Sequence, residues 1–359
     1  MQGIEWANLP DSRAGFRKTR IKEYATYRNE TEPLDSIKKD IEPVRADGRF
    51  YDFRYTRLKE KCSIVHFQLR NLLWATSKHD IFYTYGPAVK LWCPITKGSR
   101  TVLNLSQHDL SGTKISTMAA KDNFLIVGGY GGEYVCRRLD GDPMVHTGSV
   151  TVDPSGITNH LDIARSRSGA KSAYISSNDE RARIMDLSTL RITSTFKFDW
   201  PVNCTTLSPD KRILCVVGDD RNTALIDSES GDLLTTLKGH IDFSFACAWS
   251  PCGRFIATGN QDLSTRLYDT RNLSKSISTF GAKLGAVRSL HFSDDGRYLA
   301  MAEPADFVHL FDLNCPDGST HQSQVIDFFG EIAGVSFTPG DACALYIGNA
   351  GRLSPPRGG

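Results

Sequence analysis

Residues 239–271 read GHIDFSFACAWSPCGRFIATGNQDLSTRLYDTR, and much of the chain repeats the pattern of this stretch. Its apolar runs of five or six residues are separated by polar turns at residues 250–254 and 260–262. Runs of this length between clusters of Pro, Gly, Asn and Asp are typical of short antiparallel strands. We therefore expect strands at residues 244–249, 255–259 and 264–269.

Two marks of this unit recur at a nearly constant period. The turn at Ser250 is one of five whose starts are 42, 42, 43 and 45 residues apart, and the others begin at Ser166, Ser208, Ser293 and Thr338. An apolar residue followed by Asp closes each unit at spacings of 41, 42 and 43 residues, at Asp186, Asp227, Asp269 and Asp312. Because two independent marks keep one period, we infer an internal repeat.

A period of this size, four short strands per unit and Gly-His and Trp-Asp end marks characterise WD-repeat β-propellers. The chain resembles that family, most clearly between residues 157 and 315, and it resembles uncharacterised fungal and plant members with a charged arm before divergent blades. One Gly-His pair is present, at Gly239 and His240. The Trp of the Trp-Asp pair is replaced by Met185, Ile226, Tyr268 and Phe311.

The units define the expected architecture. We expect an all-β WD-repeat propeller of seven blades, with six blades or an incompletely closed ring as alternatives. Residues 1–57 are expected to form a polar arm that is partly helical or mobile, residues 58–350 the propeller and residues 351–359 a flexible tail. Pro and Gly in the tail are unsuited to a strand, so the strand that closes the ring is expected from residues 49–55.

Composition restricts the function. The chain has 359 residues, 40% of them hydrophobic, which is enough for a large core. Its 43 basic and 41 acidic residues give a net charge of +2, so bulk charge does not favour nucleic acid or an anionic membrane. Nine cysteines without a Cys-x-x-Cys pair predict reduced thiols in an intracellular protein. Without an apolar leader or span, we expect a cytoplasmic and/or nuclear location.

The resemblance implies a buried network in the central unit. The family places a hydrogen-bonded tetrad at four positions that here are His240, Thr258, Asp262 and Tyr268. Asp262 would accept from the turn backbone and from His240, and Thr258 would link the imidazole to the ring of Tyr268. Asp179 and Asp220 also stand seven residues before a closing Asp, so we expect them to fix turns.

An enzymatic reading of these residues is disfavoured. A group that recurs in successive units indicates architecture, whereas a catalytic group should occur once beside a unique partner. The sequence has no Gly-x-Ser-x-Gly elbow and no His-Glu-x-x-His helix. We therefore expect no catalytic activity, no cofactor and no metal.

Protein partners are the expected ligands. Propellers usually bind partners on the face that carries the loops entering each blade and the turns between second and third strands. The exposed candidates on that face are Tyr130, Arg181, Trp200, Arg221, Asp242 and Phe243. Trp and Arg dominate interface hot spots, which favours Trp200, Arg181 and Arg221. The first hypothesis is a non-enzymatic scaffold that presents this face to other proteins.

Two alternatives remain open. Residues 256–271 resemble the box of WD-repeat substrate receptors of cullin-RING ubiquitin ligases, in which Arg271 would make charge-assisted contacts with an adaptor subunit. Thr265 departs from that box because an apolar residue is usual there. The second alternative is association with nucleic acid through the basic arm residues Arg13, Arg17, Lys18, Arg20 and Lys22.

Overall fold

The computed structural model describes residues 2–25, 27–29, 32–57, 59–107, 110, 112–141, 144–314 and 320–351. Cys315 and residues 352–359, which make up most of the expected tail, lie outside this part of the chain. The described residues are mainly strands, and these form six separate sheets. None of the described helices is both long and apolar enough to cross a membrane.

Five of the sheets contain four antiparallel strands each, paired in chain order. We refer to the sheets as blades 1 to 6. Blade 1 contains β1 Leu73–Ala75, β2 Ile81–Tyr85, β3 Ala88–Cys93 and β4 Gly98–Asn104. Blade 2 contains β5 Ile115–Lys121, β6 Phe124–Gly129, β7 Glu133–Arg138 and β8 Val145–Ser149, after the short helix η2 Leu105–Gln107. Blade 3 contains β9 Thr158–Arg165, β10 Lys171–Ser177, β11 Arg181–Asp186 and β12 Arg191–Lys197.

Blades 4 and 5 follow the same order. Blade 4 contains β13 Val202–Leu207, β14 Ile213–Gly218, β15 Thr223–Asp227 and β16 Leu233–Leu237. Blade 5 contains β17 Ser244–Trp249, β18 Phe255–Asn260, β19 Ser264–Asp269 and β20 Ser278–Gly281. Blade 6 contains β21 Ser289–Phe292, β22 Tyr298–Ala302, β23 Ala305–Asp312, β24 Gln322–Phe337 and β25 Leu345–Asn349.

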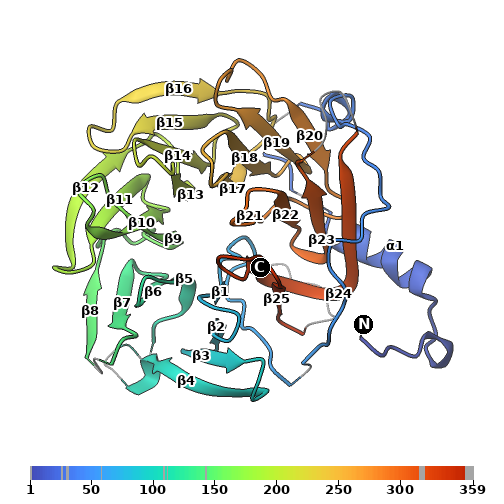
Figure 1. Ribbon diagram of the computed structural model, residues 1–359, viewed down its shortest axis with the longest axis horizontal. Coiled ribbons are helices and arrows are strands. Elements are labelled where there is room, and N and C mark those ends of the chain that lie inside the picture. The colour runs from blue at the N-terminus through green and yellow to red at the C-terminus, as the bar shows by residue number, and fades with distance from the viewer. Residues whose placement is uncertain are drawn as a thin grey trace.

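The blades stand radially around a central axis, so the molecule is a β-propeller (Figure 1). The first strand of each blade lies innermost. Neighbouring innermost strands contact one another around the whole circle, in the order β1, β5, β9, β13, β17, β21, β24 and back to β1. The all-β propeller expected from the repeats is therefore confirmed.

The strand β24 decides how the ring closes. Its residues 322–331 pair with β23 as the fourth strand of blade 6, and its residues 332–337 pair with β25. The second half of β24 therefore occupies a seventh innermost position, and β25 lies next to it. No further strand among the described residues joins β25, so the structure has the six blades of the alternative count and a seventh position of two strands.

The repeated serine turns explain why the sequence has its period. Ser250 Oγ accepts a hydrogen bond from Phe255 N at 2.8 Å, and the equivalent bonds from Ile213 to Ser208 and from Tyr298 to Ser293 are both 2.9 Å. Each serine thus fixes the hairpin between the first two strands of its blade, as side chains in such turns commonly do.

The N-terminal arm is folded onto blades 5 and 6. It contains η1 Trp6–Asn8, α1 Arg13–Glu23 and α2 Asp35–Lys38, and α1 lies beside β24 (Figure 1). The Ser12 side chain caps α1 by accepting from Gly15 N at 3.1 Å. Further on, Arg45 forms an isolated parallel bridge with Gln322. The expected closing strand at residues 49–55 is wrong, because these residues pair with no strand.

Candidate protein-interaction sites

The tetrad positions of blade 5 form one buried network. His240 Nδ1 lies 2.8 Å from Asp262 Oδ2, and His240 Nε2 lies 2.9 Å from Thr258 Oγ1. Asp262 also accepts from the backbone N–H of Ile241 at 3.2 Å. The Tyr268 hydroxyl donates to a backbone carbonyl of the preceding loop at 3.0 Å. Burial would raise the pKa of Asp262, but the imidazole and these hydrogen bonds outweigh it and lower that pKa.

These contacts connect the entry loop of blade 5 to its second and third strands. No member of the tetrad is more than 5% exposed, so the network has no surface on which a substrate could react. Buried polar groups stabilise a fold when all of them are hydrogen-bonded. The other two turn aspartates are also held locally, since Asp179 pairs with Arg183 and Asp220 accepts from Asn222 N at 2.6 Å.

The connections that enter the innermost strands and the turns between second and third strands lie at one end of the blades, and we call this end the loop face. Six of the predicted partner-binding residues lie there. Tyr130 and Trp200 are half-buried, and Arg181 and Arg221 have side chains exposed by 36% and 54%. Tyr130 donates its hydroxyl to Val65 O at 3.0 Å. These four residues come from blades 2 to 4 and their connections.

Asp242 is a correction to the expected exposed set. It is only 4% exposed, because Asn29 of the arm donates to its carboxylate through both N and Nδ2, at 3.1 and 2.9 Å. Gln261 Nε2 also donates to Tyr27 O at 2.8 Å, and neighbouring Phe243 is half-buried. The arm therefore covers the loop face of blade 5, and Glu32 of the arm also reaches Arg221 of blade 4 at 3.7 Å.

Arg271 lies away from these residues, at the opposite end of blade 5. Its guanidinium donates to both carboxylate oxygens of Asp269, at 2.9 and 2.6 Å, while its side chain remains 69% exposed. Arg254 donates to the same carboxylate at 3.1 Å. The Arg271 hydrogen bond is the largest cause that holds the pKa of Asp269 well below its ordinary value. The aromatic-Asp-x-Arg end of the box is thus stabilised by hydrogen bonds between its own Arg271 and Asp269.

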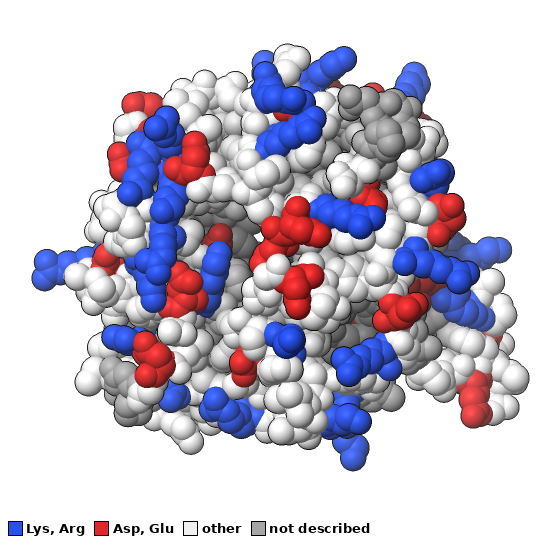
Figure 2. Space-filling view, in the orientation of Figure 1, with Lys and Arg blue, Asp and Glu red and all other residues white. Residues whose placement is uncertain are grey.

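The basic arm residues face the propeller to very different degrees. Arg20 is completely buried, and it donates through Nε and Nη2 to the two carboxylate oxygens of Asp306 at 2.9 and 2.7 Å. Arg17 bonds to the same carboxylate and stacks over Phe329 at 4.1 Å. Figure 2 shows acidic and basic side chains interspersed on the face in view. Arg13 also pairs with Asp327 of β24 at 2.8 Å, so three of the five basic residues bind the propeller, while Lys18 and Lys22 are exposed.

One cavity was not expected from the sequence. It has a volume of about 770 Å³ and lies at the seventh position, between β24 of blade 6 and the strands of blade 1. Apolar side chains line both walls, among them Ile326, Phe328, Leu73, Tyr83 and Trp92. We call this cavity the seventh-position groove. The sequence did not reveal the length of β24, a single strand that ends blade 6 with its first half and enters the seventh position with its second half.

One edge of β25 opens into this groove. On that edge Cys62 N donates to Asn349 O at 3.0 Å, and no other backbone hydrogen bond joins the edge to a described residue. Because successive residues of a strand alternate, Leu345 and Ile347 direct their backbone N–H and C=O groups to the same open side. Buried or half-buried strand edges of this kind favour pairing with another segment.

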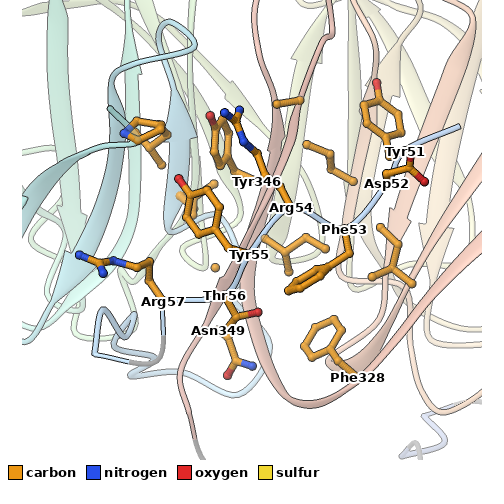
Figure 3. A pocket seen from close by; sticks show the side chains of 18 of the residues that line it. Tyr51, Asp52, Phe53, Arg54, Tyr55, Thr56, Arg57, Phe328, Tyr346 and Asn349 are labelled. Atoms are coloured by element: carbon orange, nitrogen blue, oxygen red, sulfur yellow. The ribbon is translucent and has the colours of Figure 1, made fainter. Parts of the chain in front are cut away.

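The arm passes over the groove without closing it. Residues 51–57 run across it, and the ring of Phe53 lies beside that of Phe328 (Figure 3). Gln324 holds the start of this segment, because its Oε1 accepts from Phe50 N and Tyr51 N at 2.8 and 2.9 Å. The segment is therefore a cover that side-chain contacts hold, not a strand of the sheet.

Comparisons with known proteins agree with this architecture. Residues 231–269 match the family model described as WD domain, G-beta repeat. The chain is 26% identical over 264 residues to uncharacterized protein C4G3.03 of Schizosaccharomyces pombe, and the match covers 69% of this chain and 74% of that protein. It is 28% identical over 161 residues to nuclear distribution protein PAC1 of Coccidioides posadasii, covering 38% of this chain and 34% of PAC1.

Solved structures extend the comparison to the fold. A chain in a crystal structure of the mitotic checkpoint complex matches with a TM-score of 0.67 at 16% identity, and the match covers 85% of this chain and 96% of that chain. At this identity the likeness concerns the fold alone. Proteins with such propellers generally act as interaction scaffolds. The repeat match, the relatives and the blade geometry together support a WD-repeat β-propeller.

Proposed function

We propose that the protein is a non-enzymatic scaffold, cytoplasmic and/or nuclear, and that it binds an extended segment of a partner protein in the seventh-position groove. The open edge of β25 is the observation that carries this proposal. An exposed strand edge pairs with an incoming strand through main-chain hydrogen bonds, and pockets beside it select the side chains. The groove offers both features next to each other.

The other blades indicate what the partner segment must look like. In each of them a third strand follows the second, and the third strands β19 and β23 are buried along their whole length. A segment added to β25 would likewise have blade 6 on one side and blade 1 on the other. The partner chemistry that fits is therefore an apolar strand of about five residues, the length of β25.

The test compares two identical substitutions at different places. Ile347 is half-buried beside the groove, and Ile347→Lys places a charge there. Ile95 is 67% exposed and does not line the groove, so Ile95→Lys is the matched control. We expect proteins that co-purify with the wild type and the control to be lost from Ile347→Lys, at a temperature at which thermal unfolding shows both variants to be folded.

Amide hydrogen exchange adds a direct readout of the strand edge. In the complex with a groove-dependent partner, the amides of Leu345 and Ile347 should exchange more slowly than in the free protein. If no co-purifying protein depends on Ile347, or if these amides exchange at the same rate with and without the partner, the groove is not the binding site.

A substrate receptor of a cullin-RING ubiquitin ligase is the second candidate. The exposed Arg271 side chain at the end of β19 favours it, since an adaptor could reach this residue at the rim. Arg271→Ala should abolish adaptor co-purification and leave thermal unfolding unchanged. Unaltered co-purification, or no adaptor with the wild type, would rule this candidate out.

A further inference from the structure

Two arginines stand at the loop-face ends of the innermost strands on either side of the seventh position. Arg70 precedes β1 of blade 1, and Arg288 directly precedes β21 of blade 6. The second half of β24 lies between these strands and contacts both of them. The two residues thus flank one sector of the central channel.

Most of the guanidinium nitrogen atoms of this pair have no hydrogen-bond partner in the part of the chain that the structure describes. Arg70 is 5% exposed, and its buried Nε and Nη1 atoms make no hydrogen bond to a described residue. The Nε and Nη1 atoms of Arg288 are also buried and unpaired. Among the described residues, the Arg288 guanidinium makes one hydrogen bond, from Nη2 to Gln261 Oε1 at 3.3 Å, and it lies 3.9 Å from the ring centre of Phe245.

The two positive charges influence each other. Burial first, and then the charge of Arg70, lower the pKa of Arg288 to about 9. Burial is also the main cause that lowers the pKa of Arg70. The neighbouring His66 has a pKa lowered to about 4, first by burial and then by both arginines, so it is neutral at physiological pH. All three pKa values are lowered because positive charge is concentrated where little solvent reaches the side chains.

The nearest carboxylates are bonded elsewhere. Asp219 accepts from Asn203 Nδ2 at 2.8 Å, and Asp242 accepts from Asn29 of the arm. Glu331 accepts from the Tyr24 hydroxyl at 3.2 Å. These three groups soften the positive potential from a distance, but among the described residues no carboxylate forms an ion pair with either arginine.

Buried guanidinium groups without a partner are unfavourable, and structures normally supply one. We propose that Arg70 and Arg288 form a binding site for a phosphate group at the loop-face mouth of the channel. Four unpaired nitrogen atoms call for an acceptor with several oxygens, and arginine donors match phosphate geometry well. A carboxylate has only two oxygens, so it satisfies fewer of these donors. Free phosphate and a phosphorylated side chain share this chemistry.

The first experiment measures thermal unfolding during a titration with inorganic phosphate, with chloride keeping the ionic strength constant. A ligand that binds only the folded state raises the unfolding temperature in a saturable way. We expect this rise in the wild type and a loss of at least about tenfold in phosphate affinity in Arg70→Gln and in Arg288→Gln, the size expected when charge-assisted hydrogen bonds are removed. Arg221→Gln removes a more exposed arginine from the same face and should keep the full response.

The phosphate-free baseline separates binding from a structural role. If the arginines are unpaired in the free protein, Arg70→Gln should unfold at the same or a higher temperature than the wild type in chloride alone. A lower temperature in chloride together with an unchanged phosphate response would overturn the proposal. So would a wild type that responds to phosphate no more than to chloride.

Calorimetric titrations identify the source of the phosphate. Inorganic phosphate, O-phosphoserine and acetate are compared at equal ionic strength. Binding of inorganic phosphate supports a free-phosphate ligand, and binding of O-phosphoserine alone supports a phosphorylated side chain. Binding of acetate as tight as that of both phosphates would refute the preference for phosphate.

Discussion

The ion pair between Arg20 and Asp306 makes a sharp prediction about the N-terminal arm. Both side chains are fully buried, and the Asp306 carboxylate also bonds to Arg17 and accepts from Gly330 N at 2.8 Å. Asp306→Asn removes the charge but keeps the shape, and Asn tolerates the left-handed φ of 71° at this position. Two guanidinium groups then face a neutral amide in a dry environment.

Removal of one partner from a buried ion pair costs about 3–5 kcal/mol. Each 1.4 kcal/mol is a factor of about ten, so the undocked arm should become at least about a hundredfold more populated. The rate of trypsin cleavage after Arg20 measures this population, because Arg20 is completely buried in the docked arm and can be cleaved only when the arm is undocked. We expect cleavage after Arg20 to accelerate by about that factor in Asp306→Asn.

The matched control is Asp35→Asn in the same arm. Asp35 is exposed and pairs with Lys38 on the surface of α2, so its loss should change the cleavage rate little. Equal cleavage rates in Asp306→Asn and the wild type would refute the reasoning, since the arm would then be held by other contacts. A similar acceleration in Asp35→Asn would show that the assay reports net charge instead of docking.

Three further changes test the blades. Burial raises the pKa of Tyr268 to about 12, whereas the pKa of Tyr in the unfolded chain is about 10. The neutral hydroxyl of Tyr268 therefore contributes its full stabilisation below pH 10, and this contribution is lost as the pH rises towards 12. In urea unfolding, Tyr268→Phe should show a shallower alkaline loss of stability than the wild type. His240→Ala leaves the buried Asp262 without its imidazole and should lower the free energy of unfolding by about 2–3 kcal/mol. A Cβ on Gly218 would lie 2.1 Å from a backbone oxygen and 2.3 Å from a Trp ring carbon, so Gly218→Ala should cost about 1–3 kcal/mol in the same measurement. Gly98→Ala is its control, because a Cβ there meets nothing closer than 3.7 Å. An unchanged midpoint in His240→Ala, or equal midpoints in the two glycine variants, would contradict these expectations.

Local repetition made the blades predictable from sequence. The serine turns and the closing aspartates make hydrogen bonds within one hairpin, such as that from Phe255 N to Ser250 Oγ. The same residue types therefore recur in successive units. The arm left no such mark. The run of basic residues around Arg20 is compatible with a solvated helix, and only the pairing of Arg20 with Asp306, 286 residues away, makes it part of the fold.

The ring closure was misjudged for a different physical reason. Residues 49–55 have strand-like composition, but a strand forms only where a ladder partner is available. Gly330 lies inside β24, which continues through it from blade 6 into the seventh position. Gly330 adopts a φ of 148°, which L side chains rarely accept, and this conformation lets one strand leave blade 6 and enter the seventh position.

The seventh position therefore concentrates the open chemistry of the molecule. Its outer part is an apolar groove with an unpaired strand edge, and at its loop-face end lie two arginines with unpaired nitrogen atoms. The physical demands differ, since the groove requires apolar area and main-chain pairing while the arginines require negative charge. Salt should weaken binding at the arginines and affect the groove little. Ile347→Lys should therefore keep the phosphate response, and Arg70→Gln should keep the groove partners. A variant that abolished both would mean that the two features are a single site, in which a partner segment carries the phosphate into the channel.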